Sequence, residues 1–293
     1  MRLFFKSSWC TSNFLPTLLK TENMAFSFVK YHGAGNDFIM INGFDSPVLN
    51  WSPAQRAALC RRHYGIGADG IIIIRPSDNA AFEMVYYNAD GEVGSLCGNG
   101  SRCALAFAHD MGIIDKEKWV SYLAFGGDYL GRVNGQGDVS IEVPVQQSKV
   151  KSLSDNQFFI DTGSPHLIVL KKPSDNWVEE AFQFRWDERF KPGGCNVNYL
   201  WQESTSTSKD QWHIATFERG VEAPTEACGT GNIAALLVLV DQELVGTGQT
   251  LCIKNAGGML LTSFKKNAAS NDDEKVILSG PAKKTFEGKF NLG

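Results

Sequence analysis

Apolar residues in this chain fall into many short runs and two longer ones, with polar or glycine-rich segments between them. Short runs such as Ile71 to Ile74 and Phe82 to Tyr87 have the length of strands. Two longer segments, Ser101 to Met111 and Asn232 to Leu244, have the length of helices. Ile233 to Val240 is apolar on every side, so the second helix must be covered all round. A sheet wrapped around it like a barrel is the simplest cover, because the chain supplies many short strands.

Three further segments add to the predicted secondary structure. Ser52 to Gln55 is a capping box with proline at the first helical position, so we expect a helix from there to about Tyr64. The second half of the chain opens with expected strands at Phe158 to Asp161 and Leu167 to Leu170. The polar stretch from Lys171 to Arg189 carries scattered apolar residues, and we expect it to contain a helix.

Each of the two long helices begins close after a cysteine in a glycine-rich tetrapeptide. We call these tetrapeptides, Cys97-Gly98-Asn99-Gly100 and Cys228-Gly229-Thr230-Gly231, the two helix mouths. A helix N-terminus offers free N–H groups and partial positive charge, which lower the pKa of a thiol and bind an anion such as a carboxylate. Two such mouths that face each other would make a thiolate, a thiol and a cradle for a carboxylate.

The chain repeats itself at an offset of 131 residues. Three landmarks share this offset: Phe28 to Lys30 with Phe159 to Asp161, Cys97 with Cys228, and Gly126-Gly127 with Gly257-Gly258. After each glycine pair comes an apolar stretch, a polar turn and a strand-like run that ends in proline. Three matches at one offset predict two homologous halves with a pseudo-two-fold relation, residues 24–144 and 145–281.

Composition narrows the class of function. A chain of 293 residues is long enough for two domains, each with its own core. A net charge of −4 and the absence of a basic run argue against nucleic acid as a partner. No run approaches the roughly 18 apolar residues of a membrane span, so no membrane partner is expected. A small molecule is the better expectation.

The cysteines and glycines also bear on compartment and cofactor. Seven scattered cysteines do not have the spacing of a secreted disulfide framework, so we expect a reducing, cytoplasmic location. No close C-x-x-C pair has matching His or Cys partners, so we expect no metal. Gly65 to Gly70 resembles a dinucleotide fingerprint but precedes a strand instead of following one, which argues against a nucleotide cofactor. The cysteines expected to be packing or surface residues are Cys10, Cys60, Cys103, Cys195 and Cys252.

The two ends of the chain stand apart from the repeat. Residues 1–23 are weakly basic, and their apolar residues are too interrupted to form the apolar segment of a secretory signal. We expect a disordered extension ahead of Met24, with a transit peptide as the alternative. At the other end, we expect residues 282–293 to return to the first half.

Six motifs carry a specific family resemblance. They are Phe28 to Phe38 (FVKYHGAGNDF), Asn88 to Gly91 (NADG), Cys97 to Cys103 (CGNGSRC), Gly163 to His166 (GSPH), Glu218 to Gly220 (ERG) and Ala227 to Gly231 (ACGTG). In this order they resemble the motifs of diaminopimelate epimerase, from about Ala25 to the C-terminus. The resemblance implies a cofactor-independent epimerase that interconverts LL- and meso-diaminopimelate, a step toward lysine and, in many bacteria, peptidoglycan.

The resemblance also implies an architecture of the α/β class, more closely described as α+β. Two similar domains are expected, each a barrel-like and mostly antiparallel sheet around a central helix. The active site would lie in the cleft between them. We also consider a homodimer.

The two cysteines suit the chemistry that the family implies. Inverting an amino-acid α-carbon without an imine cofactor means removing a weakly acidic proton from one face and returning one to the other. Cys97 and Cys228, from opposite halves, would do this as thiolate base and thiol acid, exchanging roles with the handedness of the substrate. Charge that develops on the substrate carboxylate would be met by amides of the mouths, at Gly98, Asn99, Gly229 and Thr230.

The resemblance assigns roles to further residues. It places His166 and Glu218 near the thiols, where they would shuttle or bias protons. Arg219 is the expected clamp for a substrate carboxylate, through paired hydrogen bonds. The expected ligands of the distal part of the substrate are Asn36, Asn88, Ser164 and Asn196. Two departures concern this distal recognition: Ser164 replaces a more usual asparagine, and Pro224 stands before Thr225 where glutamate is more usual.

Two alternatives stay open at this point. One is another two-cysteine racemase, for proline or a related amino acid, whose substrate would not need Arg219 and the asparagine set. The other is an amino-acid-binding protein that keeps the fold without catalysis. The presence of both cysteines argues against this second alternative.

Overall fold

The structure is a computed structural model that describes residues 24–45, 50–95, 97–145, 149–203, 211–265 and 275–292. Residues 1–23, where we expect a disordered extension, lie outside the described residues. Within the described ranges the chain forms four α-helices and 17 strands. The predicted α+β class is therefore confirmed.

The elements divide between the two halves of the chain. The helices are α1 (Pro53–Cys60), α2 (Gly98–Asp110), α3 (Trp177–Arg185) and α4 (Gly229–Asp241), with one turn of 3-10 helix at Glu188–Phe190. The strands of the first half are β1 (Met24–Gly33), β2 (Asn36–Asn42), β3 (Gly70–Arg75), β4 (Glu83–Asn88), β5 (Val120–Ala124), β6 (Gly127–Val133) and β7 (Val139–Pro144). The later strands are β8 (Lys151–Ser154), β9 (Gln157–Asp161), β10 (Pro165–Val169), β11 (Asn196–Trp201), β12 (Gln211–Glu218), β13 (Ala223–Thr225), β14 (Leu251–Asn255), β15 (Gly258–Lys265), β16 (Lys275–Gly280) and β17 (Lys283–Leu292).

The strands form one sheet with an internal symmetry: counted from either edge to the centre, the strands follow each other in the corresponding order. One side runs β17-β1-β2-β3-β4-β5-β6-β7 and the other β8-β9-β10-β11-β12-β14-β15-β16, and β7 pairs with β16 in the middle. The parallel pairs also correspond: β2–β3 and β4–β5 on one side, β10–β11 and β12–β14 on the other. β13 pairs with β12 outside this series. This symmetry confirms the predicted pseudo-two-fold relation between two similar halves.

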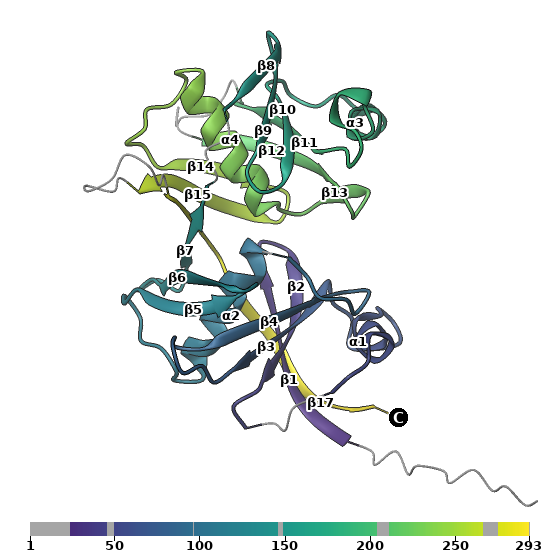
Figure 1. Ribbon diagram of the computed structural model, residues 1–293, viewed down its shortest axis with the longest axis vertical. Coiled ribbons are helices and arrows are strands. Elements are labelled where there is room, and N and C mark those ends of the chain that lie inside the picture. The colour runs from purple at the N-terminus through teal and green to yellow at the C-terminus, as the bar shows by residue number, and fades with distance from the viewer. Residues whose placement is uncertain are drawn as a thin grey trace, which may run out of the picture.

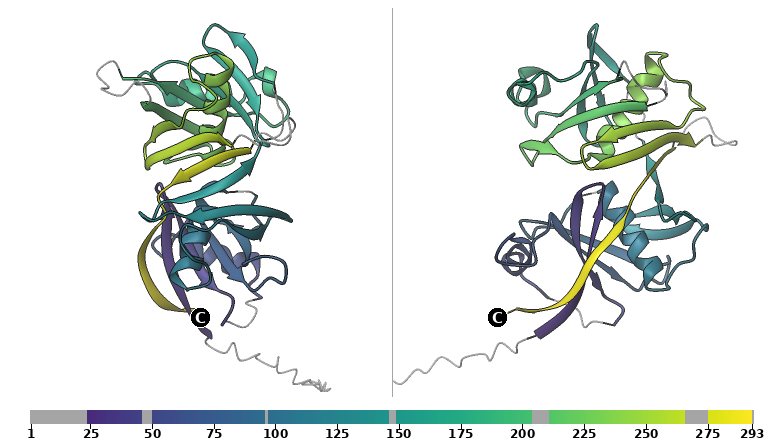
Figure 2. Two further views of the ribbon diagram at one scale, coloured as in Figure 1. Left: turned by 90° about the vertical axis from the view of Figure 1, so that its left-hand side faces the viewer. Right: turned by 180° about the vertical axis from the view of Figure 1, so that it is seen from behind.

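The strand that follows each half crosses to the other half. β8 follows β7 and pairs with β9 of the second half. β17 follows β16 and pairs with β1, from Met24 opposite Leu292 to His32 opposite Lys283. Figure 2 shows β17, in yellow, lying along β1, in purple. Each half therefore takes its outermost strand from the segment that leaves the other half.

Each half places its sheet between a buried central helix and an outer helix. α2 and α4 lie inside the two halves, whereas α1 and α3 lie outside them (Figure 1). Leu105 of α2 and Leu236 of α4 belong to one large hydrophobic cluster that spans both halves. Leu59 of α1 and Ala181 of α3 belong to two separate clusters on the outer faces. The all-round burial predicted for the second long helix is therefore confirmed.

Both central helices start three residues earlier than the apolar pattern predicts. Cys97 and Cys228 are the N-caps: each has an extended backbone, and its side chain accepts a hydrogen bond from the N–H three residues on. Cysteine is not among the residues preferred at this position, which is why the pattern missed these starts. The outer helix α1 also differs from the prediction, at its C-terminal end. It ends at Cys60 and not at about Tyr64, because the backbone of Arg61 is extended.

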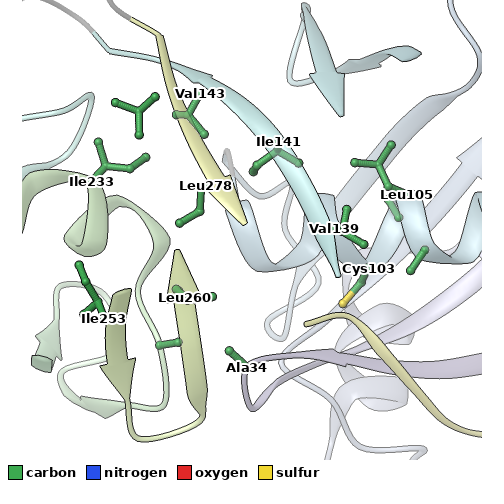
Figure 3. Packing of buried hydrophobic residues seen from close by; sticks show 14 of the residues in the cluster. Ala34, Cys103, Leu105, Val139, Ile141, Val143, Ile233, Ile253, Leu260 and Leu278 are labelled. Atoms are coloured by element: carbon green, nitrogen blue, oxygen red, sulfur yellow. The ribbon is translucent and has the colours of Figure 1, made fainter. Parts of the chain in front are cut away.

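The two helix mouths meet on the pseudo-two-fold axis. Ile141 of β7 pairs with Leu278 of β16 in the central strand pair, and each is the third residue of the run that ends in proline in its half, Val139 to Pro144 and Val276 to Pro281. Figure 3 shows them on neighbouring strands, with Ile233 of α4 to one side and the Leu105 region of α2 to the other. A Cβ atom on Gly98 would lie 4.0 Å from Gly229 Cα, and a Cβ atom on Gly229 would lie 3.7 Å from Gly98 Cα. Either added atom would also lie 3.1 Å from Leu278 Cδ2, so the mouths face each other against one leucine methyl group.

We expect Gly229→Ala and Leu278→Ala to be coupled through this contact. The added methyl of Gly229→Ala overpacks the axis and should destabilise the fold by about 1–3 kcal/mol. Leu278→Ala alone removes a fully buried side chain and should cost about 2–5 kcal/mol. In the double variant the cavity accommodates the new methyl, so the loss should be smaller than the sum by about 0.5–3 kcal/mol.

Urea unfolding of the two single variants and the double variant measures this coupling. Gly248→Ala is the matched control, because nothing lies within 4 Å of its added Cβ atom. Its effect should add to that of Leu278→Ala within about 0.5 kcal/mol. Simple additivity of Gly229→Ala with Leu278→Ala would show that the mouths are not in contact.

Candidate active site

Cys97 and Cys228 occupy equivalent positions at the starts of α2 and α4. Their backbone φ/ψ angles are −119°/105° and −111°/112°, and each Sγ accepts a 3.4 Å hydrogen bond, from Gly100 N and Gly231 N respectively. Glycine is required at the second of these positions, because a Cβ atom on Gly231 would lie 2.5 Å from Asn198 Oδ1. The structure thus brings the two predicted thiols to the facing mouths.

Burial raises the pKa of both thiols, to about 11 for Cys97 and about 12 for Cys228. Hydrogen bonds from the helix N–H groups act in the opposite direction and lower both pKa values, but the loss of water outweighs them. The nearby carboxyl group of Glu218 raises both further. The lowering of a thiol pKa by a helix N-terminus is therefore present at both mouths but is outweighed by desolvation.

Asn36 connects Cys97 to a charged cluster of the first half. Its Nδ2 donates to Asp69 Oδ2 at 2.7 Å, which fixes the orientation of the amide because a carboxylate only accepts. Its Oδ1 therefore faces Cys97 Sγ at 3.7 Å and Asn99 Nδ2 at 3.3 Å. Arg62 in turn donates to Asp69 Oδ1 at 2.9 Å. This cluster holds an acceptor oxygen beside the first thiol.

Asn99 ties the two mouths together. It is buried, and its Nδ2 donates to the main-chain oxygen of Ala227, the residue before Cys228, at 2.9 Å. Its Oδ1 accepts from Arg102 Nη2 at 2.7 Å. A side chain of the first mouth is therefore hydrogen-bonded to the backbone of the second.

His166 is fully buried on β10 and is oriented by Asn198 of the neighbouring β11. Asn198 Nδ2 donates to the main-chain oxygen of Leu167 at 3.1 Å and lies 3.2 Å from His166 Nδ1. Because the carbonyl oxygen only accepts, the amide nitrogen faces the ring, so Nδ1 accepts and the ring proton is on Nε2. Thr216 Oγ1 donates to Asn198 Oδ1 at 3.0 Å and holds this orientation. The Nε2–H group is buried and has no acceptor among the described residues.

The charge state of His166 follows from its surroundings. Burial, helped by the positive charge of Arg219, lowers the pKa of His166 to about 3. The ring is therefore neutral near pH 7. In this form Nε2 carries a proton that is available as a hydrogen-bond donor, and it does not accept a proton there.

Glu218 lies at the end of β12, within electrostatic reach of both mouths. Its Oε2 accepts from Thr225 Oγ1 at 2.9 Å. Burial raises the pKa of Glu218; the hydrogen bond from Thr225 lowers it, and Asp69 of the other half raises it further. Glu218 is therefore a carboxyl group of the second half that faces charged groups of the first.

The residues predicted to bind the distal part of the substrate divide between the halves. In the second half, Asn196 Nδ2 donates to Ser164 Oγ at 2.9 Å, and Asn196 Oδ1 accepts from the main-chain nitrogen of Arg219 at 2.9 Å. These three residues therefore lie together, with the Arg219 side chain exposed. In the first half, Asn88 ends β4, and its main-chain N–H donates to the main-chain oxygen of Glu92 at 2.9 Å.

Comparison with known proteins places this geometry in a family. The sequence model described as diaminopimelate epimerase matches residues 28–150 and 158–285. The chain belongs to the diaminopimelate epimerase family. It is 36% identical over 265 residues to a protein named diaminopimelate epimerase from Chlorobaculum tepidum, covering 89% of this chain and 99% of that one. It is 35% identical over 268 residues to a protein of the same name from Flavobacterium psychrophilum, covering 88% and 97%.

Solved structures share the fold at much lower identity. A phenazine biosynthesis protein of the PhzF family from Bacillus anthracis superposes with a TM-score of 0.71 and 15% identity, covering 92% of this chain and 100% of that one. A probable proline racemase from Agrobacterium radiobacter gives a TM-score of 0.66 and 13% identity, covering 91% and 93%. These likenesses show that the epimerase-family chain shares its fold with them.

Two residues of this epimerase-family site were not singled out by the sequence. Asn198 lies two residues after Asn196 on β11, so both side chains point to the same face of the strand. That alternation is the signal that could have found it. Arg102 lies four residues after Gly98 and so on the same face of α2. A charged residue in an otherwise buried helix was the available signal.

The described residues carry few features of other site types. They contain no group of three or more His, Cys, Asp or Glu residues that could hold a metal ion. α2 and α4, the longest described helices, have 13 residues each and are too short to cross a membrane. The six described cysteines are free thiols.

The neutral, buried state of His166 should make stability depend on pH. Its pKa is about 3 in the folded chain and about 6.5 when unfolded, so between these values the unfolded chain binds more protons. The stabilising contribution is full above about pH 6.5 and is lost as the pH falls toward 3. From this group alone we expect the free energy of unfolding to be about 2 kcal/mol lower at pH 5 than at pH 7.

Denaturant unfolding of the wild type and His166→Gln at the two pH values checks this expectation. The free energy of unfolding at pH 7 minus that at pH 5 should be about 2 kcal/mol smaller for the variant than for the wild type, whatever the overall stability of the variant. An unchanged difference would mean that His166 is not held neutral by burial.

Proposed function

We propose that this protein is a cofactor-independent diaminopimelate epimerase that interconverts the LL and meso forms, a step toward lysine. Membership of the family supports the substrate. The observation that supports the mechanism is the meeting of two equivalent helix mouths, each capped by a cysteine, on the pseudo-two-fold axis. Cys97 and Cys228 would then approach one substrate carbon from opposite halves of the chain.

The two thiols would act as a base and an acid. The thiolate of one cysteine takes the α-proton and becomes a thiol, leaving an electron pair on the α-carbon. The thiol of the other cysteine gives its proton to the opposite face of that carbon and becomes a thiolate. The reverse reaction starts from the opposite protonation state, so one pair of groups serves both directions.

The facing helix N-termini suit the charge that develops during this reaction. Loss of the α-proton places negative charge on the substrate carboxylate. The N–H groups of Gly98, Asn99, Gly229 and Thr230 are fixed in a water-poor site, where such donors contribute most to catalysis. The same desolvation that raises both thiol pKa values therefore strengthens the stabilisation of the carboxylate.

His166 and Glu218 would have different roles beside the thiols. His166, with its proton on Nε2, supplies a hydrogen bond and does not act as a base. Glu218 has a raised pKa and sits within reach of both mouths, which suits a carboxyl group that exchanges a proton with a thiol. Ser164, Asn196 and Arg219 would hold the distal amino-acid end from the second half, with Asn36 and Asn88 on the first.

Cys97→Ala and Cys228→Ala test the pair of thiols. Each variant should lower epimerisation of LL-diaminopimelate by at least about 100-fold, because each removes one of two required proton-transfer groups. Cys103→Ala is the matched control: this buried cysteine of α2 should affect stability and leave turnover near the wild-type value. Chiral analysis of the product, without pyridoxal phosphate, measures the rates.

Two outcomes would refute the proposed function. Near wild-type turnover in either Cys97→Ala or Cys228→Ala would exclude the two-thiol mechanism. Racemisation of proline by the wild type, with no exchange of the α-proton of diaminopimelate in deuterated water, would replace the substrate with one that lacks a distal amino acid.

Arg219→Lys tests recognition of the distal end. Lysine keeps the charge but loses the planar fork that pairs with a carboxylate, so KM for diaminopimelate should rise about tenfold or more while kcat changes less. Arg189→Lys is the control, because Arg189 forms such a paired contact with Asp187 on the surface. Steady-state kinetics with an unchanged KM for Arg219→Lys would show that Arg219 does not bind the substrate.

A further inference from the structure

Arg102 is a fully buried cation behind the first helix mouth. Its exposed fraction is 0%, and it is among the largest fully buried side chains of the protein. Burial lowers the pKa of its guanidinium group, which expresses the cost of keeping this charge away from water. A charge in such a position normally has a partner of opposite sign.

The contacts of Arg102 are to neutral groups. Nη2 donates to Asn99 Oδ1 at 2.7 Å and Nη1 donates to the main-chain oxygen of Gly98 at 3.3 Å. Nε is buried without a partner, and no carboxylate forms an ion pair with Arg102 in the described part of the chain. Glycines leave room for the group: Cβ atoms on Gly33 and Gly280 would lie 3.4 Å from Nη2 and 3.5 Å from Nε.

The second mouth has no such cation. The 131-residue offset makes Ile233 the counterpart of Arg102, and Figure 3 shows Ile233 among the apolar residues of the shared core. Behind Cys228 stand neutral amides: Asn232 Nδ2 donates to the main-chain oxygen of Cys228 at 2.7 Å and to Asn255 Oδ1 at 2.8 Å. The two mouths therefore match in backbone geometry and differ by one buried positive charge.

Several titratable groups act on Cys97 and Arg102 from the surrounding elements. For Cys97 they are Glu218 on β12, Arg102 and Cys103 on α2, Cys228 before α4 and Tyr86 on β4. For Arg102 they are Cys97, Cys103 and Asp138, of which Asp138 is exposed. Cys103 lies deep in the helix, and burial raises its pKa beyond that of Cys97. Cys97 is therefore the group of this set best placed to supply a negative charge near Arg102.

We propose that Arg102 is the built-in counter-charge of the first mouth, and that it makes Cys97 the more readily ionised of the two thiols. Arg102 acts through Cys97 and is thus a positioning residue for charge. The proposal takes its catalytic meaning from the proposed function, because it names the thiol that acts first as base.

Hydrogen bonds from neighbouring groups lower the pKa of both thiols, so the buried charge is what distinguishes them. Cys97 Sγ accepts from Gly100 N, and amide hydrogen bonds from Gly100 and Asn99 both lower the pKa of this thiol. The positive charge of Arg102 also lowers the pKa of Cys97, whereas the groups that lower the pKa of Cys228 are the neutral donors Thr230 and Gly231. One contact favours a neutral Cys97, the 3.7 Å approach to Asn36 Oδ1. That contact is long and involves a weak S–H donor, so a buried opposite charge outweighs it.

Alkylation measured thiol by thiol tests the proposal. The wild type is treated briefly with iodoacetamide from about pH 7 to pH 12, with circular dichroism confirming that it stays folded, and peptide mass spectrometry gives separate initial rates for Cys97 and Cys228. The midpoint of each profile reports the pKa of that thiol independently of its access to the reagent. We expect the Cys97 midpoint to lie at least about one pH unit below that of Cys228, which is a tenfold difference in thiolate fraction.

Three variants isolate the charge. Arg102→Gln should raise the Cys97 midpoint by about one unit or more and leave that of Cys228 nearly unchanged. Arg102→Lys keeps the charge and should hold the Cys97 midpoint within about half a unit of the wild type. Arg185→Gln is the matched control, since it removes another buried guanidinium, one that pairs with Glu222 away from the mouths, and should move neither midpoint.

The wild-type measurement decides the assignment even if Arg102→Gln does not fold. A lower midpoint for Cys228 than for Cys97, or an unmoved Cys97 midpoint in folded Arg102→Gln, would overturn the proposal. Because alkylation needs no substrate, the test is separate from the proposed function. A protein that fails to epimerise diaminopimelate but shows the expected midpoints would refute that function and keep the charge assignment.

Discussion

The close approach of Gly98 and Gly229 across the Leu278 methyl group is the constraint on which the rest of the structure depends. Two helices whose ends meet on an axis must each run from that axis into the middle of its own half. Each half must then wrap a sheet around its helix, and the helix of the second half is apolar on all sides for that reason. The strand pair of β7 and β16 crosses the same axis, so the contact and the continuity of the sheet support each other.

This arrangement sets two electrostatic effects against each other. Helix N-termini that face each other concentrate partial positive charge, which favours an anion between them. Packing the mouths together also removes water, which disfavours a thiolate and raises both thiol pKa values. Desolvation outweighs all the surrounding groups at both thiols, so the two differ in which groups oppose it. The positive charge of Arg102 acts on Cys97, whereas neutral donors, Thr230 and Gly231, act on Cys228.

The sequence predicted three features from residue spacing alone. They are the repeat, from matches at one offset, the helix that is buried all round, from its unbroken apolar run, and the thiols at two helix starts, from the glycines that follow each cysteine. Three features lay beyond it for physical reasons. The helices begin early because cysteine side chains accept the capping hydrogen bonds. The sign of the thiol pKa shifts depends on burial that only tertiary packing creates. Asn198 acts through its contact with His166 on the neighbouring strand. Arg102 acts through its contact with Asn99, in a turn of helix that is buried by packing against the opposite half.

The crossing of β8 and β17 has a consequence for the origin of the chain. A unit that runs from β1 to β8, or from β9 to β17, ends in a strand that pairs with the other unit and lacks the strand that pairs with its own first strand. Two identical copies could satisfy each other by exchanging that strand around the same axis, and their two identical mouths would then form a symmetric site. Gene duplication and fusion of such a strand-swapped dimer would produce the present topology. Once fused, the two copies could diverge in sequence. Arg102 in one half and Ile233 at the equivalent position of the other make the two mouths chemically different, which two identical chains could not do.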